Sequence, residues 1–166
     1  VNIYNSLNWK MPIFVHLPMI LAPDKTKLSK RHGATSVEEF KQAGYLNTAM
    51  FNFLVLLGWA LDDKTEMFTI NELIKVFDIS KISKSPAIFN KEKLDWFNGR
   101  YILNLTHEDF EKEINNYFKQ YLNSNKYKAI QSYDINDISV MIKQRCKTLN
   151  DAIMLTEFLY QEPEFR

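Results

Sequence analysis

Helix-start signals recur along the sequence and constrain the fold more than any other feature. Ser36 and Thr69 each stand three residues before a glutamate, which is the pattern of a capping box. Asn90 and Thr106 precede further runs in which apolar residues repeat at helical spacing. Together these patterns predict helices over 1–9, 37–43, 46–57, 69–77, 91–101, from 106 onward, within 123–134, over 135–146 and over 149–159.

Few segments are left for strands, so the predicted fold class is mainly α with a few short strands. The apolar run from Ile13 to Leu21 predicts a strand that Pro18 confines to a sheet edge or divides in two. A second short strand is predicted near 66–69. The pattern of residues changes after Leu103, and we expect two helical lobes that are hinged near 102–106.

The helix predicted over 46–57 is unusually apolar. Its large side chains leave almost no polar face: Met50, Phe51, Phe53, Leu54, Val55, Leu56 and Leu57. We therefore expect it to be buried on most sides, with Asn47 or Thr48 capping its start and Gly58 ending it. An aromatic stripe that stacks nucleic-acid bases is the alternative, but the continuous apolar character favours a core helix.

Composition excludes several classes of protein. Hydrophobic residues make up 46% of the chain and aromatic residues 14%, which is ample for a packed core. The formal net charge is +1, so contact with a nucleic acid would depend on local patches. No apolar stretch reaches the roughly 18–20 residues of a membrane span. The 4 glycines are too scattered for a phosphate-binding glycine loop.

Cysteine and histidine usage predicts neither a disulfide framework nor a metal site. Cys146 is the only cysteine, which is typical of a reducing compartment, and we expect a cytoplasmic protein. His16, His32 and His107 are far apart in the sequence, so no metal site is expected. The adjacent carboxylates at 62–63 fit a solvated acidic turn better than a catalytic pair.

The densest chemical signal is the segment Lys27–Gly33, which reads Lys-Leu-Ser-Lys-Arg-His-Gly. Its first five residues hold three cations and a hydroxyl, between the apolar run and the capping box at Ser36. Cations at this spacing can contact a polyphosphate, and charge-assisted hydrogen bonds are about twice as strong as neutral ones. A solvated basic turn is the alternative. The position of the loop between a strand and a helix favours phosphate binding.

This segment resembles the second signature, the KMSKS loop, of class I aminoacyl-tRNA synthetases. With His16-Leu17-Pro18 upstream and His32-Gly33-Ala34 downstream, it is similar to the variant found in glutamyl-tRNA synthetases. The resemblance covers roughly the whole chain and is densest before Ile102. It continues in the family's order through Gly44-Tyr45-Leu46, Ala49, Asn52-Phe53-Leu54, Leu57-Gly58-Trp59, Glu66-Met67-Phe68-Thr69, Lys93-Leu94-Asp95-Trp96 and Asn98.

The resemblance implies part of a ligase that activates glutamate with ATP and transfers it to the 3′ end of tRNA(Glu). It implies Lys30 and Lys27 as catalytic residues, and an ATP-binding loop formed by Lys27, Ser29, Lys30 and Arg31. Mg²⁺ would accompany ATP as part of the substrate, without a ligand from this chain. The implied partners are tRNA(Glu), ATP and glutamate, with no membrane, and we expect a monomer.

The resemblance also implies a domain organisation. Residues 1–103 would form the end of the catalytic domain, with the KMSKS-type loop and a unit that contacts the tRNA stem. Residues 104–166 would begin a helical anticodon-binding domain. The nucleotide fold, the first ATP signature and most of the glutamate pocket would lie outside the chain. We therefore expect a fragment that is folded but inactive by itself.

A second segment competes with the chosen loop. Lys81-Ile82-Ser83-Lys84-Ser85 matches the generic signature more literally. Pro86 follows it at once, with no predicted strand before it and no glycine after it. We therefore interpret this segment as a surface connection.

Two alternative functions are also compatible with the pattern. A glutaminyl-tRNA synthetase or another relative in the same class carries a similar loop, but the anticodon region of the glutaminyl enzyme consists of β-barrels, whereas 104–166 is predicted to be helical. The other alternative is a non-catalytic helical module that binds RNA or protein.

Overall fold

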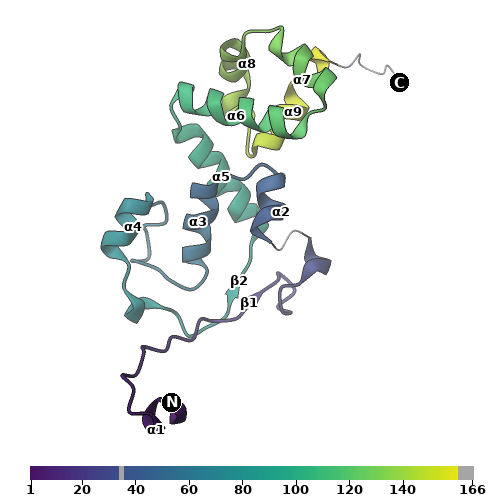
Figure 1. Cartoon of the computed structure of the whole chain (residues 1–166). Coiled ribbons are helices and arrows are strands. Elements are labelled where there is room, and N and C mark those ends of the chain that lie inside the picture. Colours follow the sequence, from purple (N-terminus) through teal and green to yellow (C-terminus); the bar gives the residue numbers. More distant parts are fainter. Residues whose placement is uncertain (34–35, 161–166) are drawn as a thin grey trace.

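The computed structural model describes residues 1–33 and 36–160, and this part of the chain is mainly helical, as predicted (Figure 1). The α-helices are α1 (Asn2–Ser6), α2 (Val37–Gln42), α3 (Asn47–Leu56), α4 (Ile70–Val76), α5 (Lys91–Asn104), α6 (His107–Tyr121), α7 (Ser124–Gln131), α8 (Ile135–Ile142) and α9 (Leu149–Leu155). The 3₁₀ helices are η1 (Lys30–His32), η2 (Ile79–Lys81), η3 (Lys143–Arg145) and η4 (Glu157–Leu159).

Helix α5 connects two groups of elements. Helices α2, α3 and α4 lie with the strands toward one end, and α6 to α9 gather at the other (Figure 1). Helix α3 packs along α5, and α6 packs against both α8 and α9. Helix α1 stands apart from both groups at the N-terminal end (Figure 1).

The predicted helix starts are confirmed where a side chain caps the helix. Ser36 Oγ accepts a hydrogen bond from the Glu39 N–H at 3.2 Å, and the Glu39 carboxylate accepts one from the Ser36 N–H at 2.9 Å. Thr69 makes the same reciprocal pair with the third residue of α4. Asn90 and Thr106 cap α5 and α6 through single side-chain bonds. These signals act within four residues, so local sequence is sufficient to place them.

Helix α3 differs from its prediction at its start and on one face. Its N-cap is Leu46 rather than Asn47 or Thr48, and no side chain caps it. The core fixes this start, because Leu46 is buried and its N–H donates to the side chain of Asn98 at 2.8 Å. The helix is also less enclosed than its composition indicates, since Phe51 and Leu54 remain 43% and 41% exposed.

The strand prediction is only partly correct. Of the run over 13–21, only Ile20–Leu21 forms a strand, β1, whose parallel partner is the unpredicted β2 (Ala87–Ile88). The predicted strand near 66–69 is wrong. There the buried Asn52 takes the place of a neighbouring strand: its amide donates to the Glu66 carbonyl and its oxygen accepts from the Phe68 N–H, both at 2.7 Å.

The buried side chains form three clusters. The largest joins α6 to α9 with the start of α3 and the end of α5: Leu46, Ala49, Ile102, Phe110, Ile114, Tyr117, Phe118, Ile130, Ile138, Ile142, Cys146, Leu149 and Ala152. A second cluster lies behind the strands: Phe40, Tyr45, Met50, Phe53, Phe89, Leu94 and Phe97. The third is small: Trp59, Phe68 and Leu73.

Hydrogen bonds join the two groups of helices. Asn98 of α5 is fully buried, accepts from the Leu46 N–H and donates to the Lys147 carbonyl at 2.6 Å. The Leu149 N–H donates to the Gly44 carbonyl at 2.8 Å. The Tyr117 hydroxyl donates to the Gln42 carbonyl at 2.6 Å. The Gly44–Leu149 bond thus holds the turn after α2 against the start of α9, and the Tyr117 bond holds the end of α2 against α6.

Candidate functional site

The basic loop begins with a tight hairpin turn after β1. Leu21 and Lys27 pair as an antiparallel bridge, and the Ala22 N–H donates to the Thr26 carbonyl at 2.8 Å. The Lys25 N–H closes the turn on the Ala22 carbonyl at 2.9 Å, and Lys25 adopts a positive φ of 62°. This is the geometry of a type I turn followed by a left-handed residue, with a proline at the favoured second position.

The loop continues into the single 3₁₀ turn η1. The His32 N–H donates to the Ser29 carbonyl at 2.9 Å, and the Gly33 N–H donates to the Lys30 carbonyl at 3.2 Å. Gly33 has φ 103° and ψ −151°, a backbone conformation that is essentially confined to glycine. Leu28 anchors the middle of the loop by packing against the second core cluster.

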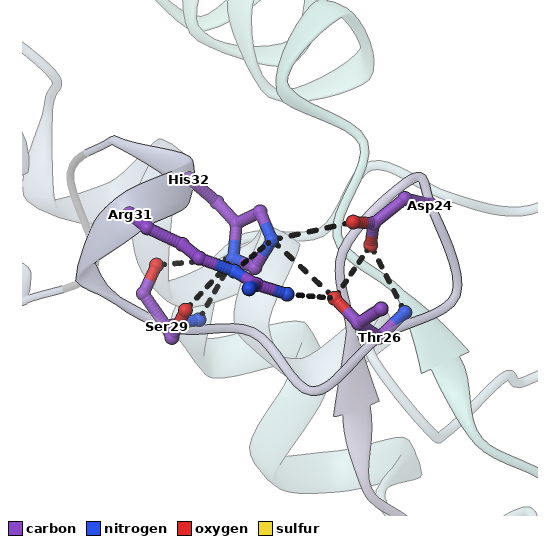
Figure 2. Close-up of polar contacts among 5 residues, drawn as sticks. All are labelled: Asp24, Thr26, Ser29, Arg31 and His32. Atoms are coloured by element: carbon purple, nitrogen blue, oxygen red, sulfur yellow. Dashed lines mark hydrogen bonds and ion pairs between the residues drawn. The ribbon is translucent and has the colours of Figure 1, made fainter.

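The His32 side chain lies between the hairpin turn and the 3₁₀ turn (Figure 2). Its Nδ1 is 3.1 Å from both the backbone nitrogen and the hydroxyl of Ser29. Its Nε2 is 3.5 Å from the Asp24 carboxylate and 3.4 Å from the Thr26 hydroxyl. The imidazole is only 16% exposed, and it contacts hairpin residues that precede it by six and eight positions in the sequence.

Asp24 and Thr26 complete this contact. The Asp24 carboxylate accepts from the Thr26 hydroxyl at 2.7 Å and from the Thr26 N–H at 3.0 Å (Figure 2). These two bonds hold the pKa of Asp24 below its ordinary value of 3.8, and the neighbouring His32 acts in the same direction. Asp24 is therefore an ionised acceptor that faces the imidazole at neutral pH.

All four residues predicted for ATP binding lie on this one loop, but they differ in their contacts. Lys27 and Lys30 are exposed, and within the part of the chain that the structure describes neither ammonium has a partner. Ser29 contacts His32. Arg31 reaches back to the Thr26 hydroxyl at 3.2 Å, so its guanidinium belongs to the contacts around His32. The roles of these residues stay predictions.

Asp24 and Thr26 were not predicted as site residues. A signal for them does exist, because Pro-Asp-x-Thr directly after a strand is a turn composition and Asp accepts bonds from residues two positions ahead. Their approach to His32, however, depends on the left-handed conformation of Lys25, which a lysine does not indicate.

The competing signature lies in a different environment. Its Lys81 ends η2 and donates to the Leu61 carbonyl at 2.9 Å, and the Ser83 N–H donates to the Gly58 carbonyl at 2.7 Å. Lys84 is exposed in the connection that leads to β2. This segment is thus attached to the turn after α3, as part of a surface connection.

The acidic residues that the structure describes give no second site. Asp62 accepts bonds from the backbone and hydroxyl of Thr65 and from the Lys64 N–H, and these bonds hold its pKa below 3.8. Among residues 1–33 and 36–160, no group of three or more His, Cys, Asp or Glu side chains could hold a metal ion. No helix in the same ranges is long and apolar enough to cross a membrane.

Known proteins resemble this chain along almost its whole length. The family described as "tRNA synthetases class I (E and Q), catalytic domain" matches residues 1–96. Glutamate–tRNA ligase from Dehalococcoides mccartyi is 46% identical over 168 residues, and that from Borreliella burgdorferi is 41% identical over 163. The matches cover 96% and 98% of this chain, which spans about a third (33%) of the length of each relative.

Solved structures agree with this relationship. The crystal structure of a glutamate tRNA ligase from Elizabethkingia meningosepticum, in complex with its amino acid, has a TM-score of 0.75 and 28% sequence identity. The match covers 98% of this chain and 35% of that one. The enzyme from Elizabethkingia anophelis gives a TM-score of 0.74 over 98% of this chain and 36% of that one, also at 28% identity. The chain therefore belongs to the class I tRNA synthetases of the E and Q type, and the relatives that it matches are glutamate–tRNA ligases.

Proposed function

We propose that this chain is the part of a glutamate–tRNA ligase that carries the loop acting on ATP. The observation that carries the proposal is the loop Lys27–Gly33, where two lysine ammoniums stay exposed and unpartnered among the described residues while the rest of the loop is bonded internally. A loop of this kind offers mobile charge on a fixed backbone, which suits a reaction whose charge moves onto phosphate.

The proposed reaction has two steps. A carboxylate oxygen of glutamate attacks the α-phosphorus of ATP, and the bond to the β-phosphate oxygen breaks as pyrophosphate leaves with the electron pair. A hydroxyl at the 3′ end of tRNA(Glu) then attacks the activated carbonyl, and AMP leaves. Lys30, with Lys27 beside it, stabilises the negative charge that grows on the departing phosphates. Ser29 and Arg31 complete the ATP-binding loop, and Mg²⁺ arrives with ATP as part of the substrate.

We assign residues 1–103 to the end of the catalytic domain together with the tRNA stem-contact unit, and 104–166 to the start of a helical anticodon-binding domain. The family match over 1–96 and the end of α5 at Asn104 support this division. The packing is continuous across it, because Leu46 and Ala49 share a cluster with α6 to α9. Relative motion of the two parts at 102–106 would have to break this cluster.

The competing functions are less well supported. A glutaminyl enzyme would place β-barrels after the stem-contact unit, whereas α6 to α9 are helices. A non-catalytic module would not require the exposed lysine pair on a loop between a strand and a helix. Cys146, the only cysteine of the chain, is free and buried, and we propose the cytoplasm as the location.

The test is aminoacylation by the complete ligase that contains this segment, with tRNA(Glu) and tRNA(Gln) transcripts assayed in parallel. We expect ATP-dependent attachment of glutamate to tRNA(Glu), and no attachment of glutamine to either tRNA. Charging with glutamine, or no charging of tRNA(Glu), contradicts the proposal. The chain alone should give no glutamate-dependent ATP–pyrophosphate exchange, and exchange above background would overturn its assignment as a part of the enzyme.

A further inference from the structure

The imidazole of His32 has a role in the loop that its exposed neighbours do not share. Its ring contacts Asp24 and Thr26 on the hairpin turn and the backbone of Ser29 at the start of the 3₁₀ turn, whereas Arg31 reaches Thr26 and the ring itself (Figure 2). The two lysines flank the segment that it spans: Lys27 ends the hairpin and Lys30 begins the 3₁₀ turn. Any change in how His32 joins the turns therefore changes where the two ammoniums lie relative to each other.

The ionised Asp24 favours one tautomer of the neutral ring. In that tautomer Nδ1 carries no proton and accepts from the Ser29 N–H at 3.1 Å. The proton of the neutral ring is then on Nε2, which donates toward the Asp24 carboxylate at 3.5 Å or the Thr26 oxygen at 3.4 Å. Thr26 can accept, because its own proton is donated to Asp24 at 2.7 Å.

Two contacts are incompatible with this tautomer. The Ser29 carbonyl oxygen lies 3.2 Å from His32 Nδ1 and could accept a bond only if Nδ1 carried a proton. The Nε–H of Arg31 lies 3.3 Å from His32 Nε2 and could donate only if Nε2 had no proton. The opposite tautomer would satisfy both contacts, but it would leave the Ser29 N–H without its acceptor and set an Nε2 lone pair against the ionised Asp24. The Nε2–H tautomer avoids both costs, and Arg31 keeps its bond to the Thr26 hydroxyl.

We propose that His32 is a positioning residue: as the neutral Nε2–H tautomer it links Asp24 on the hairpin turn to Ser29 on the 3₁₀ turn, and so sets the spacing of Lys27 and Lys30 for the phosphates of ATP. The proposal rests on the proposed function of the loop. His32 itself touches no phosphate in this scheme. It acts through the backbone of Ser29, which directly precedes Lys30.

The chain offers variants that separate the two halves of this link. His32→Asn keeps an acceptor near the position of Nδ1 but is too short to reach Asp24. His32→Gln reaches toward Asp24 but removes the acceptor for Ser29, and His32→Ala removes both. Asp24→Ala removes the other end of the link. His107→Ala is the matched control, because His107 is an exposed histidine at the start of α6, outside the loop.

The kinetic experiment measures glutamate-dependent ATP–pyrophosphate exchange by the complete ligase. We expect His32→Ala to lower kcat by about 10–100-fold, because small misplacement of charge costs up to about 100-fold in rate, with the KM for glutamate unchanged. His32→Asn and His32→Gln should each recover part of the loss, and His107→Ala should match wild type. The double variant with Asp24→Ala should be no slower than His32→Ala alone, because both remove the same link.

The ring itself is tested separately in this chain by nitrogen NMR of the labelled imidazole. At neutral pH we expect a protonated Nε2 and an unprotonated Nδ1 at His32, and the opposite tautomer overturns the proposal. Circular dichroism of each variant shows whether the helices remain intact, and His32→Asn provides a second test if His32→Ala fails to fold.

Lys30→Ala distinguishes failure of this inference from failure of the proposed function. If Lys30→Ala is slow while His32→Ala and His32→Asn match wild type, His32 is not a positioning residue and the function of the loop stands. If Lys30→Ala matches wild type, the loop does not act on ATP and the inference fails with it. The double variant gives a further check. If its fold loss in kcat equals the product of the losses caused by Asp24→Ala and His32→Ala alone, the two residues act independently, and this also contradicts a single link.

Discussion

At the scale of single residues, Lys30 and Lys84 provide a direct comparison of the two KMSKS-like segments. In the complete ligase, Lys30→Ala should lower the rate of glutamate activation by about 10²–10³-fold, the usual loss when one preorganised charge contact to a transition state is removed. Lys84→Ala should change activation little, because Lys84 is exposed in a connection that is bonded to the turn after α3.

Pyrophosphate exchange at saturating glutamate measures both variants. Neither lysine lies in a core, so both proteins should melt close to wild type. If Lys84→Ala were slow in this assay and Lys30→Ala matched wild type, the segment Lys81–Ser85, and not the loop Lys27–Gly33, would act on ATP.

Gly44 and Gly33 both have positive φ, of 85° and 103°, but their surroundings differ. A Cβ on Gly44 would lie 2.5 Å from the Asn150 nitrogen and 2.8 Å from the Leu149 nitrogen, whereas one on Gly33 would meet nothing within 4 Å. Gly33→Ala should therefore cost only backbone strain, about 1–3 kcal/mol. Gly44→Ala adds a clash with backbone that cannot move away alone, and should cost about 2–3 kcal/mol more.

Urea unfolding of the two glycine variants checks this difference. The difference in unfolding free energy between the two variants is more informative than either value alone, because both variants carry the strain of a positive φ. Equal stability of Gly44→Ala and Gly33→Ala would show that α2 and the start of α9 can separate without cost.

The same residues show what sequence can predict at this scale. Charge density and position in the sequence singled out Lys27–Gly33, because that signal is local. Neither the link from Asp24 to His32 nor the approach of Asn150 to Gly44 could be predicted. The first depends on a left-handed lysine, and the second on contact between segments over 100 residues apart.

At the scale of elements, Asn98 is the residue through which α5 holds both groups of helices. Asn98→Ala would leave the buried Leu46 N–H and the part-buried Lys147 carbonyl without their partner. An unsatisfied buried group costs about 1–3 kcal/mol, and the part-buried carbonyl should cost about 1 kcal/mol, at the low end of that range, so the loss of unfolding free energy should be about 2–4 kcal/mol. Asn104→Ala, on the exposed end of the same helix, is the matched control and should be near neutral.

Urea denaturation monitored by circular dichroism measures this loss. If Asn98→Ala were as stable as Asn104→Ala, the amide would not be what fixes α3 and the Lys147–Leu149 segment on α5. The packing of the large cluster would then hold the two groups together without it.

The elements that sequence predicted are those whose signals lie within one turn. Ser36, Thr69, Asn90 and Thr106 each cap the helix that their spacing indicated. The strands were harder to predict, because a two-residue strand such as Ala87–Ile88 exists only through its partner 67 residues away, at Ile20–Leu21. Asn52 similarly converts the expected strand at 66–69 into a loop bound to a side chain.

At the scale of the whole molecule, two buried groups predict how stability depends on alkaline pH. Burial raises the pKa of Tyr117 from 10.0 to about 12, and that of the Cys146 thiol from 9.0 to about 12. The unfolded chain therefore loses these protons at lower pH than the folded chain. Their contribution to stability is complete below pH 9.0 and declines as the pH rises toward 12.

Thermal unfolding from pH 8 to 11 tests this dependence. We expect Tm to fall first above pH 9, through Cys146, and more steeply above pH 10, through Tyr117. Cys146→Ala has a smaller side chain and should be less stable throughout, but its decline should begin nearer pH 10. A decline in Cys146→Ala that begins at the same pH as in wild type would mean that the thiol does not contribute.

The charge of the whole chain predicts how it binds RNA. With 21 basic and 20 acidic residues, the net charge of +1 provides no long-range attraction, so binding of tRNA by this chain should rest on a few local lysines and arginines. Each phosphate contact contributes about 0.7–0.9 to the slope of log K against log salt. For three contacts, the affinity should fall roughly 20–40-fold between about 50 and 200 mM salt. Fluorescence anisotropy of labelled tRNA, measured at several salt concentrations, gives the slope of log K against log salt.

An affinity that does not change with salt would contradict this prediction. It would instead indicate that bases stack on exposed aromatic side chains such as Trp96, which is 52% exposed on α5.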